Sequence, residues 1–215
     1  MSISCIEILT PNLLENATLS ESGNVKTYTF TDLKQINKII IKNSNISTLT
    51  VEYKTTAEGN FTTLTPAQAS CGQDFIFTLS APVNVLVLKL TFTASGTLSA
   101  GKIIAANTLL NLSEVLSTLN GSVYAREGHH YLANGTLIKW KDFTKYSLTL
   151  TLENISLTVK QNLENILKNN TFLTYIFYGS FDTALMGEYA LRQAAFFNFD
   201  RRRALYKAAL NLLEK

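Results

Sequence analysis

The chain has 215 residues, of which 46% are hydrophobic and 16% are charged, and its formal net charge is +3. This length can bury one large core or two modest ones, and no run reaches the roughly 18 apolar residues that a membrane-spanning helix needs. The charge pattern excludes a polybasic nucleic-acid arm, and the N-terminus MSISCIEILTPN lacks the basic and long apolar regions of a signal peptide.

The first half of the sequence predicts β-structure almost without interruption. Short runs rich in β-branched and aromatic residues predict strands at Ile3–Leu9, Val25–Phe30, Ile36–Lys42, Ser47–Tyr53, Phe75–Leu79, Val83–Thr93 and Thr97–Ala105. Turn signals at Ser22-Gly23-Asn24, Glu58-Gly59-Asn60, Cys71-Gly72 and Ser95-Gly96 separate them. Many short strands with no helical period among them indicate an antiparallel sandwich or jelly roll.

Three segments of this half carry a resemblance to a known family. They are INKIIIKNSNISTLTVEYKTTAEGNFTTL, DFIFTLSAPVNVLVLKLTFT and LSAGKIIA. Over about residues 10–105, this series of strands and turns resembles the galactose-binding-like (discoidin, or F5/8 type C) jelly roll. Carbohydrate-binding members of that family present aromatic residues, Arg and His from loops at one end. Residues 1–106 contain no Trp or His, and Lys is their only basic residue. A scaffold or docking role is therefore expected here.

The second half alternates between two periods. Leu109–Leu119 has a helical apolar stripe, whereas Tyr146–Leu152 alternates like a half-buried strand. Ser156 is placed to cap a helix whose apolar face includes Leu163 and Ile166. Strand character returns at Thr171–Tyr178 and Glu188–Phe199. Asp200 is placed to cap a last helix, whose thin apolar stripe of Leu205, Ala208, Ala209, Leu212 and Leu213 predicts docking against an adjacent subunit.

The order strand–helix–strand–strand–helix makes this half an α+β unit. The block KYSLTLTLENISLTVKQNLENILKNNTFLTYIFYGSFD resembles small domains of tailed-bacteriophage tail proteins. Members of the tail-tube and distal-tail type pack one helix on a β-sandwich and assemble into rings. Residues 107–215 are therefore expected to form an assembly domain behind a sandwich of residues 1–106, and the whole fold to be mainly β.

Both histidines, His129 and His130, lie in the segment REGHHYLANGT, shortly before the only tryptophan, Trp140. Asn134-Gly135 predicts a type I′ hairpin turn that pairs Tyr131 antiparallel to the segment after it. Adjacent strand residues face opposite ways, so the two imidazoles cannot ligate one metal ion from a regular strand. The aromatic residues of this hairpin, Tyr124 included, are core residues, subunit-interface residues or ligand contacts.

The sequence contains no residue pattern typical of an enzyme active site. The sequence has no Gly-x-Ser-x-Gly elbow, no Gly-rich phosphate loop and no evident carboxylate pair of the glycosidase kind. Cys5 and Cys71 have no metal-ligand spacing and are expected to be reduced. We therefore expect no catalytic residue, no metal and no cofactor.

The run Arg201, Arg202 and Arg203 has three readings. It is a solvated face with ion pairs, a salt-sensitive contact between subunits, or a contact with DNA passing through a tail lumen. Tyr206 adds aromatic area beside it.

The sequence thus favours a non-enzymatic structural protein of a phage tail, baseplate or phage-like particle. It would build a homo-oligomeric ring, with copies of itself and neighbouring virion proteins as partners. Its expected location is the virion, assembled in the host cytoplasm, with no membrane contact. The alternative is a carbohydrate-binding module or adhesin that recognises host surface glycans, so a glycan is the other candidate partner.

Overall fold

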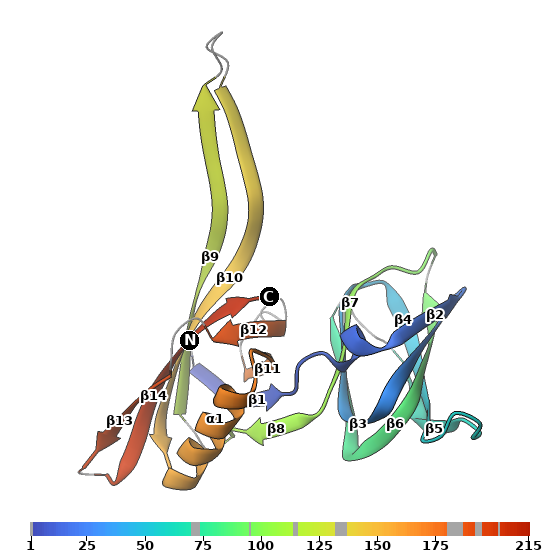
Figure 1. The fold of residues 1–215 in the computed structure, drawn as a ribbon, viewed down its shortest axis with the longest axis horizontal. Helices are drawn as coiled ribbons and strands as arrows, with labels where there is room; N and C mark the ends of the chain where they lie inside the picture. Colours follow the sequence, from blue (N-terminus) through green and yellow to red (C-terminus); the bar gives the residue numbers. More distant parts are fainter. Residues whose placement is uncertain are drawn as a thin grey trace. The chain divides into compact units, whose positions relative to one another are not determined.

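A computed structural model describes residues 2–69, 74–94, 96–113, 116–131, 137–179, 187–191, 195–201 and 203–215. The described chain is mainly β, with two antiparallel sheets and one α-helix, as the sequence predicts. It divides into two compact units: the first unit is Leu9–Leu109, and the second unit combines Met1–Ile8 with Leu110–Lys215 (Figure 1). None of its described helices has the length and apolar character to cross a membrane.

The first unit is built from one bent antiparallel sheet in the order β2-β3-β6-β4-β5, with β7 on β3. Its strands are β2 (Thr18–Ser22), β3 (Val25–Ser44), β4 (Ile46–Lys54), β5 (Thr62–Ala69), β6 (Phe75–Ala94) and β7 (Ala100–Ala106), preceded by a 3-10 helix η1 (Leu13–Asn16). Two predicted pairs of strands are therefore single long strands, β3 and β6. Their ladder shifts register between Thr29 and Lys34 and again between Ile36 and Lys38. Such irregularities bend a strand.

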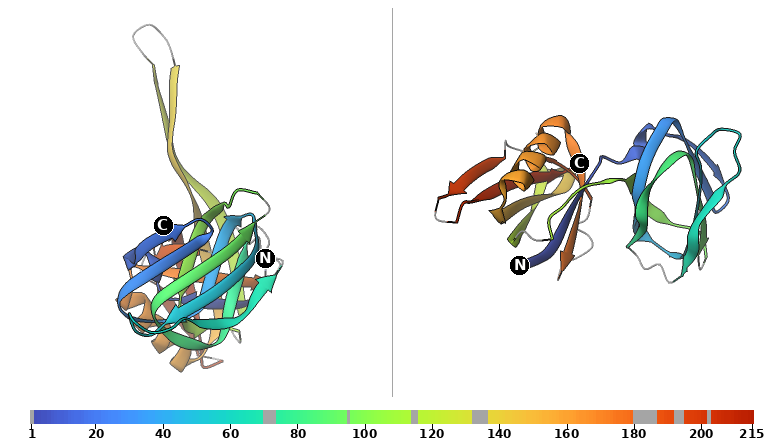
Figure 2. Two further views of the ribbon diagram at one scale, coloured as in Figure 1. Left: turned by 90° about the vertical axis from the view of Figure 1, so that its right-hand side faces the viewer. Right: turned by 90° about the horizontal axis from the view of Figure 1, so that it is seen from below.

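The bent sheet encloses the first core (Figure 2). Ile39, Ile41, Leu88, Leu90 and Phe92 of β3 and β6 lie at its centre, each at most 1% exposed. The predicted turn at Gly23 is confirmed, because Ser22 pairs with Val25 across a two-residue loop. Gly23 has φ +56°, a conformation that glycine adopts without steric cost.

The second unit has a sheet in the order β10-β9-β1-β11-β12-β14-β13, with β8 on β1. Its elements are β1 (Ser2–Leu9), β8 (Thr108–Asn111), β9 (Leu116–Tyr131), β10 (Leu137–Ile155), α1 (Leu157–Asn169), β11 (Phe172–Gly179), β12 (Gly187–Leu191), β13 (Phe196–Asp200) and β14 (Leu205–Glu214). An additional ladder joins β10 to β14. The path from β10 through β9, β1, β11, β12 and β14 therefore returns to β10 and closes around the second core.

The strand β1 corrects the division at residues 106 and 107 that the sequence suggests. Ile6 and Ile8 are fully buried in the second core, and the Leu112 amide donates a hydrogen bond to the Ile6 carbonyl. The first residues of the chain thus belong to the sheet formed by its last hundred, because their apolar side chains are buried there.

Helix α1 is confirmed, and its cap is the one predicted. The Ser156 hydroxyl accepts a hydrogen bond from the Val159 amide at 3.2 Å. Leu163 is fully buried, while Val159, Ile166 and Leu167 pack beside it against the second core.

Two predicted helices are wrong. Leu109–Leu119 contributes to strands β8 and β9, and residues 205–214 form strand β14. β14 pairs with β10 along its length and with β12 and β13 on its other edge. Leu210 and Leu212 are fully buried within the unit. The predicted terminal helix, ordered by docking on a neighbour, is thus a central strand of its own sheet.

Candidate interaction surfaces

The first candidate surface is a ribbon formed by the far ends of β9 and β10. The antiparallel pairing predicted for this hairpin is confirmed: Tyr131 pairs with Leu137, and the ladder continues to Tyr124 opposite Lys145. Figure 1 shows both strands continuing beyond the other strands of their unit. We call residues 123–131 and 137–146 the ribbon. Its turn, with Asn134 and Gly135, lies outside the described residues.

Within the described residues, the backbone ladder of the ribbon joins only its own two strands, and at its base the Tyr146 amide donates a hydrogen bond to the Glu214 carboxylate. The ladder from β9 to β1 involves Thr118 and Ser117, and the ladder from β10 to β14 begins at Ser147. At about 3.3 Å per residue, the ribbon is about 30 Å long. A two-stranded ribbon of this kind is marginally stable alone in water.

The structure gives the predicted ribbon residues backbone positions only. His129 pairs with Lys139, His130 with Ile138, and Trp140 with Gly128. The ladder breaks between Lys141 and Phe143, where Asp142 is the extra residue of an irregularity. Their side chains, like that of Tyr124, lie outside the described part of the chain, and so does Arg202. Among the described residues no group of three or more His, Cys, Asp or Glu could hold a metal ion.

The second candidate surface lies at the hairpin of β13 and β14. Arg201 and Arg203 are exposed in its turn rather than at a helix start, and the Arg203 guanidinium is 3.5 Å from the Asn154 side-chain oxygen. Next to the turn, the Phe199 and Tyr206 rings have centroids 4.9 Å apart. Phe199 remains 47% exposed. An aromatic residue that the sequence analysis missed therefore stands beside the predicted Tyr206.

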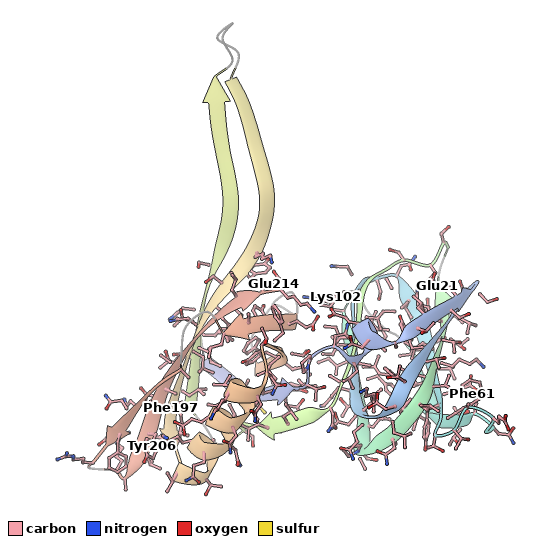
Figure 3. All side chains as sticks on the ribbon, in the orientation of Figure 1. Glu21, Phe61, Lys102, Phe197, Tyr206 and Glu214 are labelled. Carbon is pink, nitrogen blue, oxygen red and sulfur yellow. The ribbon has the colours of Figure 1, made fainter. Side chains whose placement is uncertain are left out.

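Helix α1 supplies a cation to this aromatic surface. The Lys160 ammonium lies 5.3 Å from the Phe197 ring centroid and 5.4 Å from that of Tyr206. It also pairs with the Glu164 carboxylate at 2.6 Å. Figure 3 labels Phe197 and Tyr206 on their strands. The alternation of apolar residues in Phe197-Asn198-Phe199 is a sequence signal that places both rings on one face of a strand, but it does not reveal that α1 lies beside them.

A hollow of about 360 Å³ adjoins this surface. It is lined by Glu164, Leu167, Lys168, Leu191, Ala195 and Phe197. Four of these six residues are apolar, and the two charged ones come from α1. Such a hollow suits an apolar or amphipathic side chain with a cationic end, because the Glu164 side chain is 42% exposed beside it.

Two polar residues of β1, Glu7 and Cys5, form side-chain hydrogen bonds that the sequence did not predict. The Tyr178 hydroxyl donates a hydrogen bond to the Glu7 carboxylate at 2.8 Å, and the Cys5 thiol donates one to the Asn111 side chain. Burial, together with Glu7, raises the pKa of Tyr178 well above its ordinary value. At neutral pH this hydroxyl is therefore a hydrogen-bond donor, which suits a positioning role inside the fold.

In the first unit, two lysine side chains lie close to the ring of Phe61. The ammonium groups of Lys54 and Lys89 lie 4.4 Å and 4.9 Å from its ring centroid, and Lys89 pairs with Glu52 at 2.6 Å (Figure 3). Cations thus occupy at least one face of the ring that a sugar would need for stacking.

Comparison with known proteins gives no relative for this chain. No family model, no curated protein and no solved structure matches it.

Proposed function

We propose that the chain is a non-enzymatic structural subunit of a phage tail, baseplate or phage-like particle. It builds a ring by packing of copies against one another, and its first unit, which resembles a galactose-binding-like jelly roll, acts as a docking module. The observation that carries the proposal is the ribbon of β9 and β10, whose described backbone ladder has no third strand beyond the base of the sheet.

The physical argument starts from the cost of holding such a ribbon in water. A ribbon without a third strand has few contacts to offset the entropy of ordering it. A neighbour that covers it supplies the missing contacts. The ribbon sequence is rich in the residue types that dominate protein interfaces, with Tyr124, Tyr131 and Trp140 among them. The ribbon therefore has the properties of an element that is completed by another subunit.

The composition supports the same proposal. A charged fraction of 16% is well below the roughly 25% of ordinary soluble domains. Surfaces with few charges resist association poorly, which suits a subunit whose faces are covered in an assembly. The resemblance to tail proteins supports a phage tail or phage-like particle as the class of assembly.

The test is a chain with a shortened ribbon. Residues 126–143 are replaced by Asn-Gly, so that Ala125 and Thr144, which pair in the intact protein, flank a two-residue turn. We expect this variant to keep a β-sheet circular dichroism spectrum and cooperative thermal unfolding but to lose the large species expected of the intact chain, measured by light scattering and negative-stain imaging.

A milder pair of variants separates recognition from ribbon length. Tyr131→Ala combined with Trp140→Ala should weaken assembly at least tenfold, whereas Thr144→Ala, on the same ribbon, should not. Undiminished assembly of the shortened chain, or a wild-type chain that stays monomeric at every concentration, would contradict the proposal. Glycan binding by a monomeric chain would instead support the adhesin alternative.

A further inference from the structure

The edge strand β13 points to a second contact between copies. We propose that β13 pairs antiparallel with β13 of a second copy about a two-fold axis at Asn198. The sheets of the two copies would then form one continuous sheet. Arg201, which follows β13 in each copy, would reach the hollow of the other copy.

The first argument is the hydrogen-bonding edge of β13. One edge bonds to β14 from Phe196 opposite Ala209 to Asp200 opposite Leu205. Strand β11 pairs with β12, and its first residue, Phe172, lies opposite Ala190. The paired part of β11 therefore does not extend alongside β13. No backbone hydrogen bond between described segments reaches the remaining edge.

The second argument is that β13 has few of the features that protect an edge, since its one charged residue, Asp200, lies at its end. Its sequence FFNFD contains no Lys and no Pro, and its ladder with β14 has no bulge. Proteins usually place such residues or bulges on edges to prevent pairing with other chains. Phe199, a residue of this strand, is 47% exposed and adds aromatic surface to the edge. An edge of this kind is a template for another strand.

The third argument identifies the strand that pairs with this edge as β13 of a second copy. With Asn198 of each copy opposite its equivalent, Phe197 stands opposite Phe199 of the second copy, and the converse holds by symmetry. Directly opposed residues of an antiparallel pair share a face, so two aromatic pairs form on the face next to α1. The segment is thus complementary to itself in shape and in polarity.

Charge complementarity points the same way. In this register Arg201 of the second copy lies opposite Ala195, which lines the hollow together with Glu164. The Glu164 carboxylate is 42% exposed and can accept a guanidinium in addition to Lys160. The symmetry makes this contact twice, once in each copy.

This contact does not rest on the proposed function. A ring held by the ribbon uses two different patches of the subunit, whereas the β13 contact uses one patch twice and joins copies in pairs. The two proposals therefore fail separately: ribbon variants test the ring, and β13 variants test the pair.

The first experiment exchanges the charges. Arg201→Glu and Glu164→Arg should each weaken dimer formation at least tenfold in sedimentation velocity, and the double variant should recover at least half of the loss. Arg203→Glu, in the same exposed turn, serves as the control and should leave dimer formation unchanged. Equal sedimentation of all four variants and the parent would overturn the inference.

The second experiment locates the axis. In a chain with Cys5 and Cys71 replaced by Ser, Asn198→Cys should cross-link rapidly under mild oxidation, because residues opposed across the axis have Cβ atoms about 5 Å apart. Lys207→Cys is the control. Lys207 pairs with Asn198 on β14, so the two introduced thiols would lie about 14 Å apart, three strand spacings. Equal or absent cross-linking of both variants would overturn the two-fold register.

Discussion

At the scale of single residues, the second core holds tyrosines whose burial sets their ionisation. Tyr175 and Tyr189 are each 1% exposed, and the Tyr175 ring stacks on Phe177 and meets Tyr189 edge to face, with centroids 6.1 Å and 6.0 Å apart. Burial raises the pKa of both hydroxyls far above their ordinary value near 10. The folded protein therefore keeps protons that the unfolded chain releases in alkali.

This difference predicts how stability depends on pH. Above about pH 10 the unfolded state binds fewer protons than the folded state, so the free energy of unfolding falls as pH rises. The slope approaches about 1.4 kcal/mol per pH unit for each such tyrosine. Tyr175→Phe keeps the ring and removes the titrating group, so its slope should be smaller. Urea unfolding at pH 8, 9, 10 and 11 measures both slopes, and identical slopes would refute the assignment.

At the scale of elements, the two C-terminal segments with a helical period had different outcomes. Residues 157–169 form α1, because Ser156 caps the helix and Leu163 and Ile166 make one apolar face against the core. Residues 205–214 form β14 although their period also fits a helix. Pairing with three strands overrides the helix propensity of Ala and Leu. The sequence could not reveal this, because the pairing partners are remote in the chain.

Two alanine substitutions separate the two readings of β14. A helix would bury Leu213 and leave Leu210 off its apolar stripe, whereas the strand buries Leu210 fully and leaves Leu213 partly exposed. Leu210→Ala should therefore cost about 2–5 kcal/mol, and Leu213→Ala about 1 kcal/mol or less. Chemical denaturation of both variants gives the comparison, and a larger loss for Leu213→Ala would favour the helix.

The interaction surfaces show the same limit of local reasoning. The hairpin around His129 was predictable, because a turn signal and two flanking strands are local features. The surface of Phe197, Phe199 and Lys160 was not, since it needs α1 to lie beside β13, an arrangement set by packing around the second core. Arg201 lies in the turn between β13 and β14, and not at the start of a helix as predicted.

At the scale of the whole molecule, chain order and structural order differ. The chain begins with a strand of the second unit, forms the first unit, and then returns to complete the second. Residues 1–8 read locally as one more strand of the first half, and no local pattern distinguishes the two sheets. A division by composition therefore assigns them to the wrong unit, because the contacts of Ile6 and Ile8 are with residues more than a hundred positions away.

This arrangement predicts which unit depends on the N-terminus. Removing residues 1–8 takes the fully buried Ile6 and Ile8 from the second core and the Glu7 carboxylate from Tyr178. Burial of each Ile contributes about 1.5–3 kcal/mol, so the loss is comparable with the whole stability of a small unit. Hydrogen exchange should show residues 110–215 losing protection while Leu9–Leu109 keeps it. Loss of protection confined to the first unit would mean that β1 belongs to the first sheet after all.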